Sequence, residues 1–280
     1  MKKRMISMLM VGIMTLGSLT PVAFAKENNA PVDTYDIQSV DELEKEIQQQ
    51  KQDGYLSNEE QRNLLSNTNP VVLDEYLEKE IDQIHEIFDE NEFVLNDEES
   101  FKEYNMETDN GGELKIVLED EPEPTSNSDG APKIVSRAAS NKTGTVNTTF
   151  KAIGNRYFTG SCYYQNGFVT IRFKLRNHYT VTSKQTLKKR YTAVDTLAGF
   201  SLYCNNSIFS TEWTHETATK VGSYINCRVG IASVVGVDIK GLPFKTTKYY
   251  YVNSQVKLLA KTTSGGKKGV KVQQSLQWTK

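Results

Sequence analysis

The apolar residues between positions 39 and 88 recur at the spacing of a helix. Two stretches begin with a capping box, Ser39-Val40-Asp41-Glu42 and Ser57-Asn58-Glu59-Glu60, and a third begins at Asn69-Pro70, where proline follows the cap. The third stretch places its apolar side chains on one stripe: Leu73, Leu77, Ile81, Ile84 and Phe88. The opposite face is acidic, so we expect three helices, the longest of which needs an apolar partner.

From Lys142 onward the period of the pattern changes to two. Apolar and basic residues alternate from Val169 to Arg176, after the hairpin signal Asn166-Gly167, and this predicts a half-buried strand with a basic outer face. We expect further strands at 200–204, 224–238, 248–252, 256–261 and 270–278, and one short strand at 114–118. Seven or eight short strands without a helix predict an antiparallel β-sandwich or a small barrel, preceded by an acidic helical region.

The first 25 residues have the pattern of a secretory signal peptide. Met1-Lys2-Lys3-Arg4 is followed by a short apolar run and ends in Ala23-Phe24-Ala25, an A-x-A cleavage site. The apolar run is short for a membrane span of about 20 residues. We therefore expect cleavage near Ala25 and a secreted protein of Gram-positive type, extracellular or bound to the cell wall, with no transmembrane segment in the mature chain.

A formal net charge of -2 conceals two segments of opposite sign. Residues 26–135 contain 31 acidic and 8 basic residues, a net charge of -23. Residues 136–280 contain 22 basic and 4 acidic residues, a net charge of +18. Such asymmetry indicates that each segment meets a partner of opposite sign, either outside the chain or within it.

The composition predicts four parts of the chain. These are a signal peptide (1–25), an acidic helical region (26–118), a linker rich in Pro, Ser and Gly (119–140) and a basic antiparallel β domain (141–280). Arg137 is a candidate processing site, because exposed linkers are where proteolysis concentrates. We expect the acidic region to contact the basic domain, since tethering raises its effective concentration, and to mask it until cleavage; the alternative is an acidic solubilising segment that does not dock.

All three cysteines, Cys162, Cys204 and Cys227, lie in the predicted β domain and point inward in the strand pattern. Two interpretations remain open for an exported protein. The thiols are free and packed as small apolar groups, or one disulfide forms, for which Cys204 and Cys227 are the first choice.

The sequence contains no specific catalytic or cofactor motif, so we expect a non-enzymatic protein without a metal or cofactor. His215-Glu216 lacks the second histidine of a zinc helix, and no G-x-S-x-G nucleophile turn or phosphate loop occurs. A secreted hydrolase with an inhibitory propeptide is the alternative; it would use His178 or His215, with Asp195 and a serine.

Basic residues interleaved with tyrosines are the remaining candidate site. Such a surface suits an anionic polymer, because charge gives affinity and rings stack on sugars or bases. We expect a binding module, toxin-like in one interpretation, for an anionic cell-envelope polymer, a lipid or nucleic acid; a third hypothesis is an uncleaved surface or matrix protein. The candidate anion-binding residues are Arg172, Lys174, Arg176, Lys188, Lys189, Arg190, Lys267 and Lys268.

Overall fold

Strands make up most of the chain that the computed structural model describes. The described residues are 35–51, 55–96, 98–123, 150–196, 203–239 and 242–279, and all of them belong to one unit, Tyr35–Lys280. The predicted signal peptide, Arg137 and the predicted linker beyond Glu123 lie outside the described residues.

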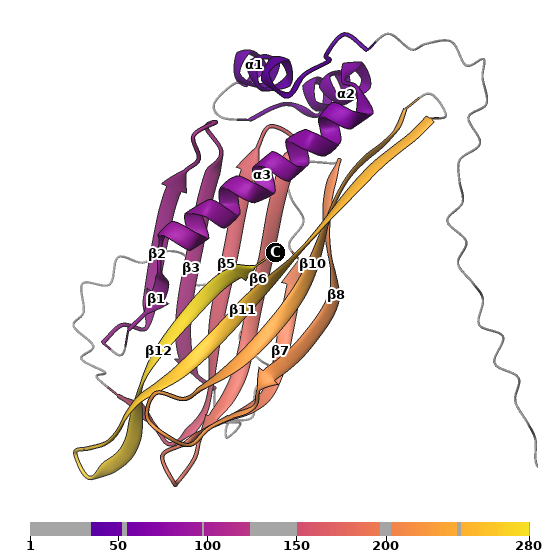
Figure 1. Cartoon of the computed structure of the whole chain (residues 1–280). Coiled ribbons are helices and arrows are strands. Elements are labelled where there is room, and N and C mark those ends of the chain that lie inside the picture. The colour runs from indigo at the N-terminus through magenta and orange to yellow at the C-terminus, as the bar shows by residue number, and fades with distance from the viewer. Residues whose placement is uncertain are drawn as a thin grey trace, which may run out of the picture. The chain divides into compact units, whose positions relative to one another are not determined.

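Two antiparallel sheets pack face to face (Figure 1). The first, named the β11 sheet, has the order β1-β12-β11-β10-β8, with β4 also paired to β12. Its strands are β1 (Phe93–Leu95), β4 (Lys151–Ala152), β8 (Cys204–His215), β10 (Tyr224–Ile239), β11 (Leu242–Ser264) and β12 (Lys267–Thr279). The prediction of a mostly β, antiparallel fold is confirmed, and of its two forms, a sandwich or a small barrel, the structure has two separate sheets.

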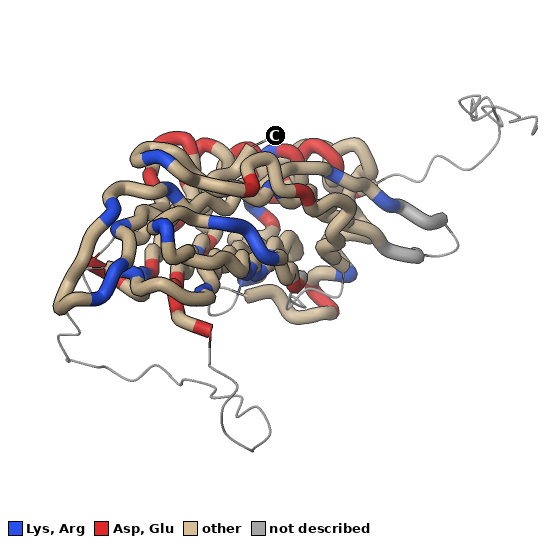
Figure 2. Tube along the Cα trace, turned by 90° about the horizontal axis from the view of Figure 1, so that it is seen from below, with Lys and Arg blue, Asp and Glu red and all other residues tan. Residues whose placement is uncertain are grey.

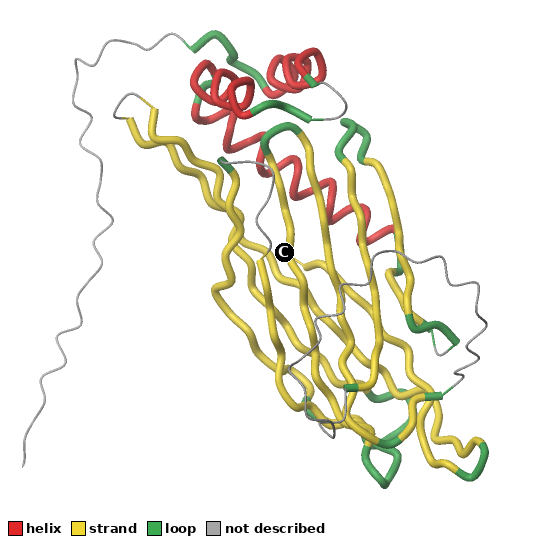
Figure 3. Tube along the Cα trace, turned by 180° about the vertical axis from the view of Figure 1, so that it is seen from behind, coloured by secondary structure: helices red, strands yellow, loops and turns green. Residues whose placement is uncertain are grey.

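The second sheet, named the β6 sheet, has the order β2-β3-β5-β6-β7-β9 and is seen from its outer side in Figure 3. Its strands are β2 (Phe101–Glu107), β3 (Glu113–Pro122), β5 (Gly154–Asn166), β6 (Val169–Val181), β7 (Leu187–Thr196) and β9 (Thr217–Ala218). The alternation predicted for β6 is present, since Ile171, Phe173 and Leu175 are fully buried in the core. Trp278 of β12 stacks on Tyr250 at 3.9 Å between ring centroids and closes the core from the other sheet.

Three helices precede the sheets: α1 (Val40–Gln50), α2 (Asn58–Asn67) and α3 (Pro70–Glu90). Their N-terminal caps follow from the sequence, because the side chains of Ser39, Ser57 and Asn69 each accept a hydrogen bond from a backbone N–H of the first turn. No helix in the described ranges combines the length and the apolar character needed to span a bilayer.

The long helix α3 packs its apolar stripe on both sheets (Figure 1). Tyr76 contacts Phe168 at the turn between β5 and β6, with 5.3 Å between ring centroids. At the other end of the helix, Phe88 contacts Phe93 of β1 and Trp278 of β12. The sandwich is therefore the apolar partner that this stripe requires.

Strand β3 runs into the stretch that composition assigns to a linker. The prediction of one short strand at 114–118 and a linker from Glu119 differs from the structure, where β3 continues to Pro122 and pairs with β5 over ten residues. Inside the sandwich Asp120 forms ion pairs with Lys151 and Arg156 at 2.9 and 2.8 Å. The acidic composition of 119–121 is thus compatible with a strand, because basic residues of the neighbouring strands lie beside it.

A buried carboxyl group joins α3 to two turns of the β6 sheet. Glu80 is fully buried and accepts hydrogen bonds from Tyr164, from Asn110 at 2.5 Å and from Asn166 at 3.2 Å. The ammonium group of Lys51 donates to Asn166 at 2.6 Å and so adds a positive charge to the network. Burial raises the pKa of Glu80 to about 6, against the lowering effect of these hydrogen bonds.

We predict that replacement of Glu80 by Gln removes a pH dependence of folding. The folded protein holds the Glu80 proton up to about pH 6, whereas the unfolded chain releases it near pH 4.5, so stability falls as pH rises through this window. The loss amounts to about 2 kcal/mol. Chemical denaturation at pH 4.5 and pH 7 should show this difference for the wild type and much less of it for E80Q. The matched control is Glu86→Gln on the exposed face of α3; an equal pH response in E80Q and wild type would contradict the assignment.

Candidate functional site

Three of the candidate anion-binding residues lie in one line on the outer face of the β6 sheet. Arg172, Lys174 and Arg176 alternate along β6 with side chains of the core, and Figure 3 shows the sheet from this side. Since alternate residues of a strand share one face, the line is a direct consequence of the period-two pattern. The structure therefore brings these three cations together.

Three rings lie side by side across the same face, in a group that we call the ring row: Tyr157, His178 and Tyr191. Strand register places them opposite one another on β5, β6 and β7. His178 stacks on Tyr191 with 3.9 Å between centroids and an interplanar angle of 15°, and lies 5.6 Å from Tyr157. Tyr191 is 50% exposed, so the end of the row is open to a ligand.

An arginine stands at each end of the ring row. The guanidinium group of Arg176 lies 4.9 Å from the centroid of Tyr157, and that of Arg190 lies 5.5 Å from the centroid of Tyr191. Cations at these distances are attracted by the ring quadrupole. The row therefore combines an exposed ring, Tyr191, with positive charge within one set of neighbouring side chains.

Acidic side chains from the end of β3 hold the ring row in place. Tyr157 donates a hydrogen bond to Glu121, and Glu123 contacts both Nδ1 of His178, at 2.5 Å, and the guanidinium group of Arg190. Burial raises the pKa of Glu123, but the bonds from His178 and Arg190 outweigh it and hold that pKa below its ordinary value. Glu123 thus stays ionised and fixes the orientation of two basic groups.

The acids of β3 also offset part of the charge on β6. Burial and the neighbouring Glu121 raise the pKa of Glu119, while Lys174 and Arg176 lower it. The net effect is a raised pKa, because burial is the largest cause. The outer face of the β6 sheet is consequently a mixed surface of charges, in which rings and cations are bordered by carboxylates.

The remaining candidate lysines lie toward the end of the sandwich where β6 turns into β7. The Gln185 side chain in this turn donates to the carbonyl oxygens of Thr262 and Gly269 at 2.6 and 2.8 Å, which ties the turn to the β11–β12 hairpin. Lysines of the turn, of the start of β7 and of the hairpin therefore gather here. This basic end consists of Lys184, Lys188, Lys261, Lys267 and Lys268, all exposed.

Lys189 differs from its neighbours, because it forms an ion pair with Glu216 at 2.5 Å. In Figure 2 many Asp and Glu residues lie along one side of the molecule, while Lys and Arg are spread over the strands. The eight candidate residues thus do not form one compact patch. Arg172, Lys174 and Arg176 form a line on β6, Lys188, Lys189 and Arg190 lie at the start of β7, and Lys267 and Lys268 lie at the tip of the β11–β12 hairpin.

The histidines considered for catalysis are not arranged with their expected partners. On β7, Asp195 lies opposite Lys174, whereas Tyr191 lies opposite His178. Asp195 is four positions along β7 from Tyr191, so it lies roughly 13 Å along the strand from the level of His178. The carboxylate at His178 is instead Glu123, 55 residues earlier in the chain, where no pattern in the sequence singles it out. His215 contacts the hydroxyl of Thr214 at 3.3 Å. Within the described residues, no group of three His, Cys, Asp or Glu side chains could hold a metal ion.

Of the two interpretations of the cysteines, the disulfide between Cys204 and Cys227 is wrong. Both cysteines are buried and free, and so is Cys162. In the register of β8 and β10, Cys227 lies opposite Trp213 and Cys204 opposite Val235, eight positions further along β10. That separation is roughly 26 Å, whereas bridged Cα atoms lie within about 7 Å. The other interpretation, buried thiols packed as small apolar groups, is the one that the structure shows.

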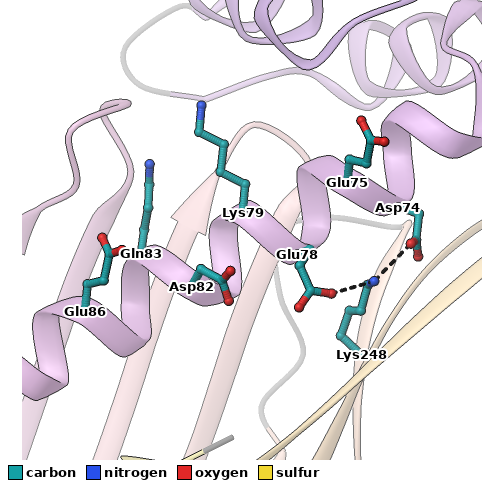
Figure 4. A pocket seen from close by; sticks show the side chains of 8 residues that line it. All are labelled: Asp74, Glu75, Glu78, Lys79, Asp82, Gln83, Glu86 and Lys248. Carbon is teal, nitrogen blue, oxygen red and sulfur yellow. Dashed lines mark hydrogen bonds and ion pairs between the residues drawn. The ribbon is translucent and has the colours of Figure 1, made fainter.

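An open pocket of about 520 Å³ runs along the acidic face of α3 (Figure 4). Lys248 of β11 reaches into it and forms ion pairs with Asp74 at 3.0 Å and Glu78 at 2.6 Å. The remaining lining is mostly acidic, so the pocket disfavours anionic ligands. Its lining residues are Asp74, Glu75, Glu78, Lys79, Asp82, Gln83, Glu86 and Lys248.

Comparisons with known proteins identify no relative: no family model, no curated protein and no solved structure matches the chain. Function must therefore be argued from the site itself.

We predict that the native protein withholds all three thiols from reagents. Burial raises the pKa of Cys162, and it raises the pKa of Cys204 to about 11, so thiolate is scarce at neutral pH. A colorimetric thiol reagent should find no reactive group in the native state and three in denaturant, with and without prior reduction. Fewer than three reactive thiols in unreduced, denatured protein would contradict this prediction and support a disulfide.

Proposed function

We propose that this protein is exported and binds an anionic polymer of the cell envelope through the ring row and the basic end. The observation that carries the proposal is the ring row itself, in which three neighbouring rings are flanked by Arg176 and Arg190. The exposed ring of Tyr191, backed by His178, supplies a stacking surface for a sugar or base, and the cations supply attraction for phosphate or carboxylate.

The basic end extends this surface along the sandwich. On β7, Lys188 pairs with Thr180, two positions beyond His178 on β6 and on the same face. Lys267 and Lys268 lie at the adjoining hairpin tip, which the Gln185 side chain holds against the turn. A chain with a regular repeat of negative charge, such as a teichoic acid, could contact the ring row and the lysines in sequence.

The internal ion pairs argue that binding is a property of the intact chain rather than of a released domain. Loss of β3 would leave Lys151 and Arg156, both buried or nearly so, without the carboxylate of Asp120. Breaking a buried pair in this way costs about 3–5 kcal/mol. It would also remove Glu123 from His178 and Arg190. We therefore propose that the acidic region shapes the site instead of blocking it.

One arrangement favours the hydrolase alternative. A carboxylate on Nδ1 of a histidine, as Glu123 is on His178, is how a general base is oriented. Both faces of the His178 ring are flanked by tyrosines, however, at 3.9 and 5.6 Å between centroids. If a secreted hydrolytic activity is found, its survival in both His178→Ala and His215→Ala would exclude this alternative.

Salt-dependent binding to soluble polyglycerol phosphate tests the main proposal. The affinity of residues 26–280 should fall as sodium chloride is raised, and Lys267→Ser with Lys268→Ser should reduce the slope of log affinity against log salt by about 1.5. The control is Lys45→Ser with Arg62→Ser, the same change of charge on exposed positions of α1 and α2. Tyr191→Ala should weaken binding at every salt concentration without altering the slope. Absent binding at low salt, or an equal effect of the control pair, would refute the proposal.

Cleavage near Arg137 should nick the protein without separating its parts. The β3–β5 ladder of ten residue pairs and the Asp120 ion pairs hold the two fragments together. With a specific protease site inserted after Arg137, the cut fragments should coelute in size exclusion and separate only in denaturant. Release of a folded fragment 138–280 that binds more tightly than the uncut chain would instead support masking.

A further inference from the structure

A second group of aromatic side chains lies on the opposite side of the sandwich, on the outer face of the β11 sheet. This aromatic platform consists of Phe209 on β8 and of Tyr249 and Tyr251 on β11. Phe209 meets both tyrosines edge to face, with centroids 5.4 and 5.6 Å apart. Tyr249 is 63% exposed and Phe209 46%, so the rings face solvent as a connected group. Contiguous exposed apolar surface of this kind marks a place of interaction.

A glycine in the central strand makes room for the platform. Gly230 lies on β10 between β8 and β11, opposite both Ser210 and Tyr251. A Cβ at Gly230 would approach the Phe209 ring to 2.5 Å and the hydroxyl of Ser210 to 2.4 Å. Only glycine therefore lets the Phe209 ring lie against the sheet, next to the tyrosines, instead of standing away from it.

One arginine sits at the side of the platform with unused hydrogen-bond donors. The guanidinium carbon of Arg228 lies 3.8 Å from the centroid of Tyr251. Within the described part of the chain this guanidinium forms no hydrogen bond or ion pair, and its Nε is buried without a partner. Its terminal nitrogens remain donors for oxygen atoms of a ligand that rests on the rings.

Amide side chains border the platform along β11 and β12, while the lysines on the same face of β11, Lys245 and Lys257, lie four positions before Tyr249 and six after Tyr251. Asn253 lies opposite Arg228, and further outward positions of β11 and β12 hold glutamines. These amide side chains are Asn253, Gln255, Gln273 and Gln277. The exposed Glu212 also lies opposite Arg228 and offsets its charge. The cations of this face are therefore spaced apart along the strand, in contrast to the grouped lysines of the basic end.

We infer that the aromatic platform binds sugar rings of a neutral glycan strand. The C–H groups on one face of a pyranose ring carry partial positive charge and fit the negative face of an aromatic ring. The ring hydroxyl and acetamido oxygens can accept from Arg228, and the amides of β11 and β12 can both donate and accept. This site lies on the opposite face from the ring row and so does not depend on the anionic surface proposed above.

The inference can be tested by saturation-transfer NMR on the protein comprising residues 26–280. The ligands are three hexasaccharides: one of N-acetylglucosamine, one of β-linked glucose and one of α-linked glucose. We expect transfer to ring C–H protons of at least one of them, with an affinity that changes less than about twofold between 50 and 500 mM salt, since no counterion is released. Tyr249→Ala, an exposed site with little risk to folding, should weaken binding about tenfold, as removal of a stacking ring does.

Two further variants separate stacking from other effects. Arg228→Lys keeps the charge but loses the fork of donors, and should weaken sugar binding while leaving polyglycerol phosphate binding unchanged. Tyr191→Ala, on the opposite sheet, should leave sugar binding unchanged. The inference fails if no hexasaccharide binds, if Tyr191→Ala weakens binding as much as Tyr249→Ala, or if only single-stranded DNA binds in a salt-dependent manner. It also fails if light scattering shows a dimer that Tyr249→Ala dissociates, because a second copy would then cover the platform.

Discussion

The fold depends on one buried carboxylate, that of Asp120. Its oxygens contact Lys151 of β4 at 2.9 Å, Arg156 of β5 at 2.8 Å and the hydroxyl of Tyr179 of β6 at 2.8 Å. Gln274 of β12 donates to Tyr179 at 3.3 Å and continues the network into the second sheet. Because Asp120 belongs to the acidic segment and its cationic partners to the basic one, the network joins the two oppositely charged segments in one core. Burying the carboxylate without the two cations, or the cations without the carboxylate, would cost free energy of folding, because an unpaired charge would be left in the core.

The same strand that supplies Asp120 to the core supplies the acids of the outer face. Neighbouring residues of a strand point to opposite sides, so Asp120 inside requires Glu119 and Glu121 outside. Glu123 follows the strand and reaches His178 and Arg190. The position of β3 in the sheet therefore determines both how the interior charges are balanced and how the ring row is oriented. A change that displaces β3 would disturb the Asp120 network and the ring row together.

Sequence patterns predicted local structure well and long-range pairing poorly. The alternation at 169–176 and the turn at Asn166-Gly167 predicted β6 and its hairpin, because both signals are carried by neighbouring residues. The partner of β3 could not be predicted, since β5 begins 32 residues after β3 ends and composition gives no register. The same limit explains the wrong disulfide: alternation placed Cys204 and Cys227 correctly on the inner face, but only the register shows how far apart they lie. His178 stands out in the sequence as one of three histidines, whereas its neighbours Tyr157 and Tyr191 follow only from strand pairing.

The carboxyl groups under α3 and at β3 have pKa values shifted in opposite directions. The packing of α3 on the sandwich and the contacts of β3 therefore depend on pH in opposite ways. Burial raises the pKa of Asp120, but Arg156 and Lys151 outweigh it and hold the pKa below its ordinary value, and the pKa of Glu123 is lowered as well. Stability from these two groups is present above the pKa of the unfolded chain and is lost only as pH falls through the lowered values. Glu80, with its raised pKa, instead favours folding at lower pH. A fall from pH 7 to pH 5 thus strengthens the packing of α3 on the sandwich, while Asp120 and Glu123 keep their negative charges. The contacts of Asp120 with Lys151 and Arg156, and of Glu123 with Arg190, therefore stay in place over this range.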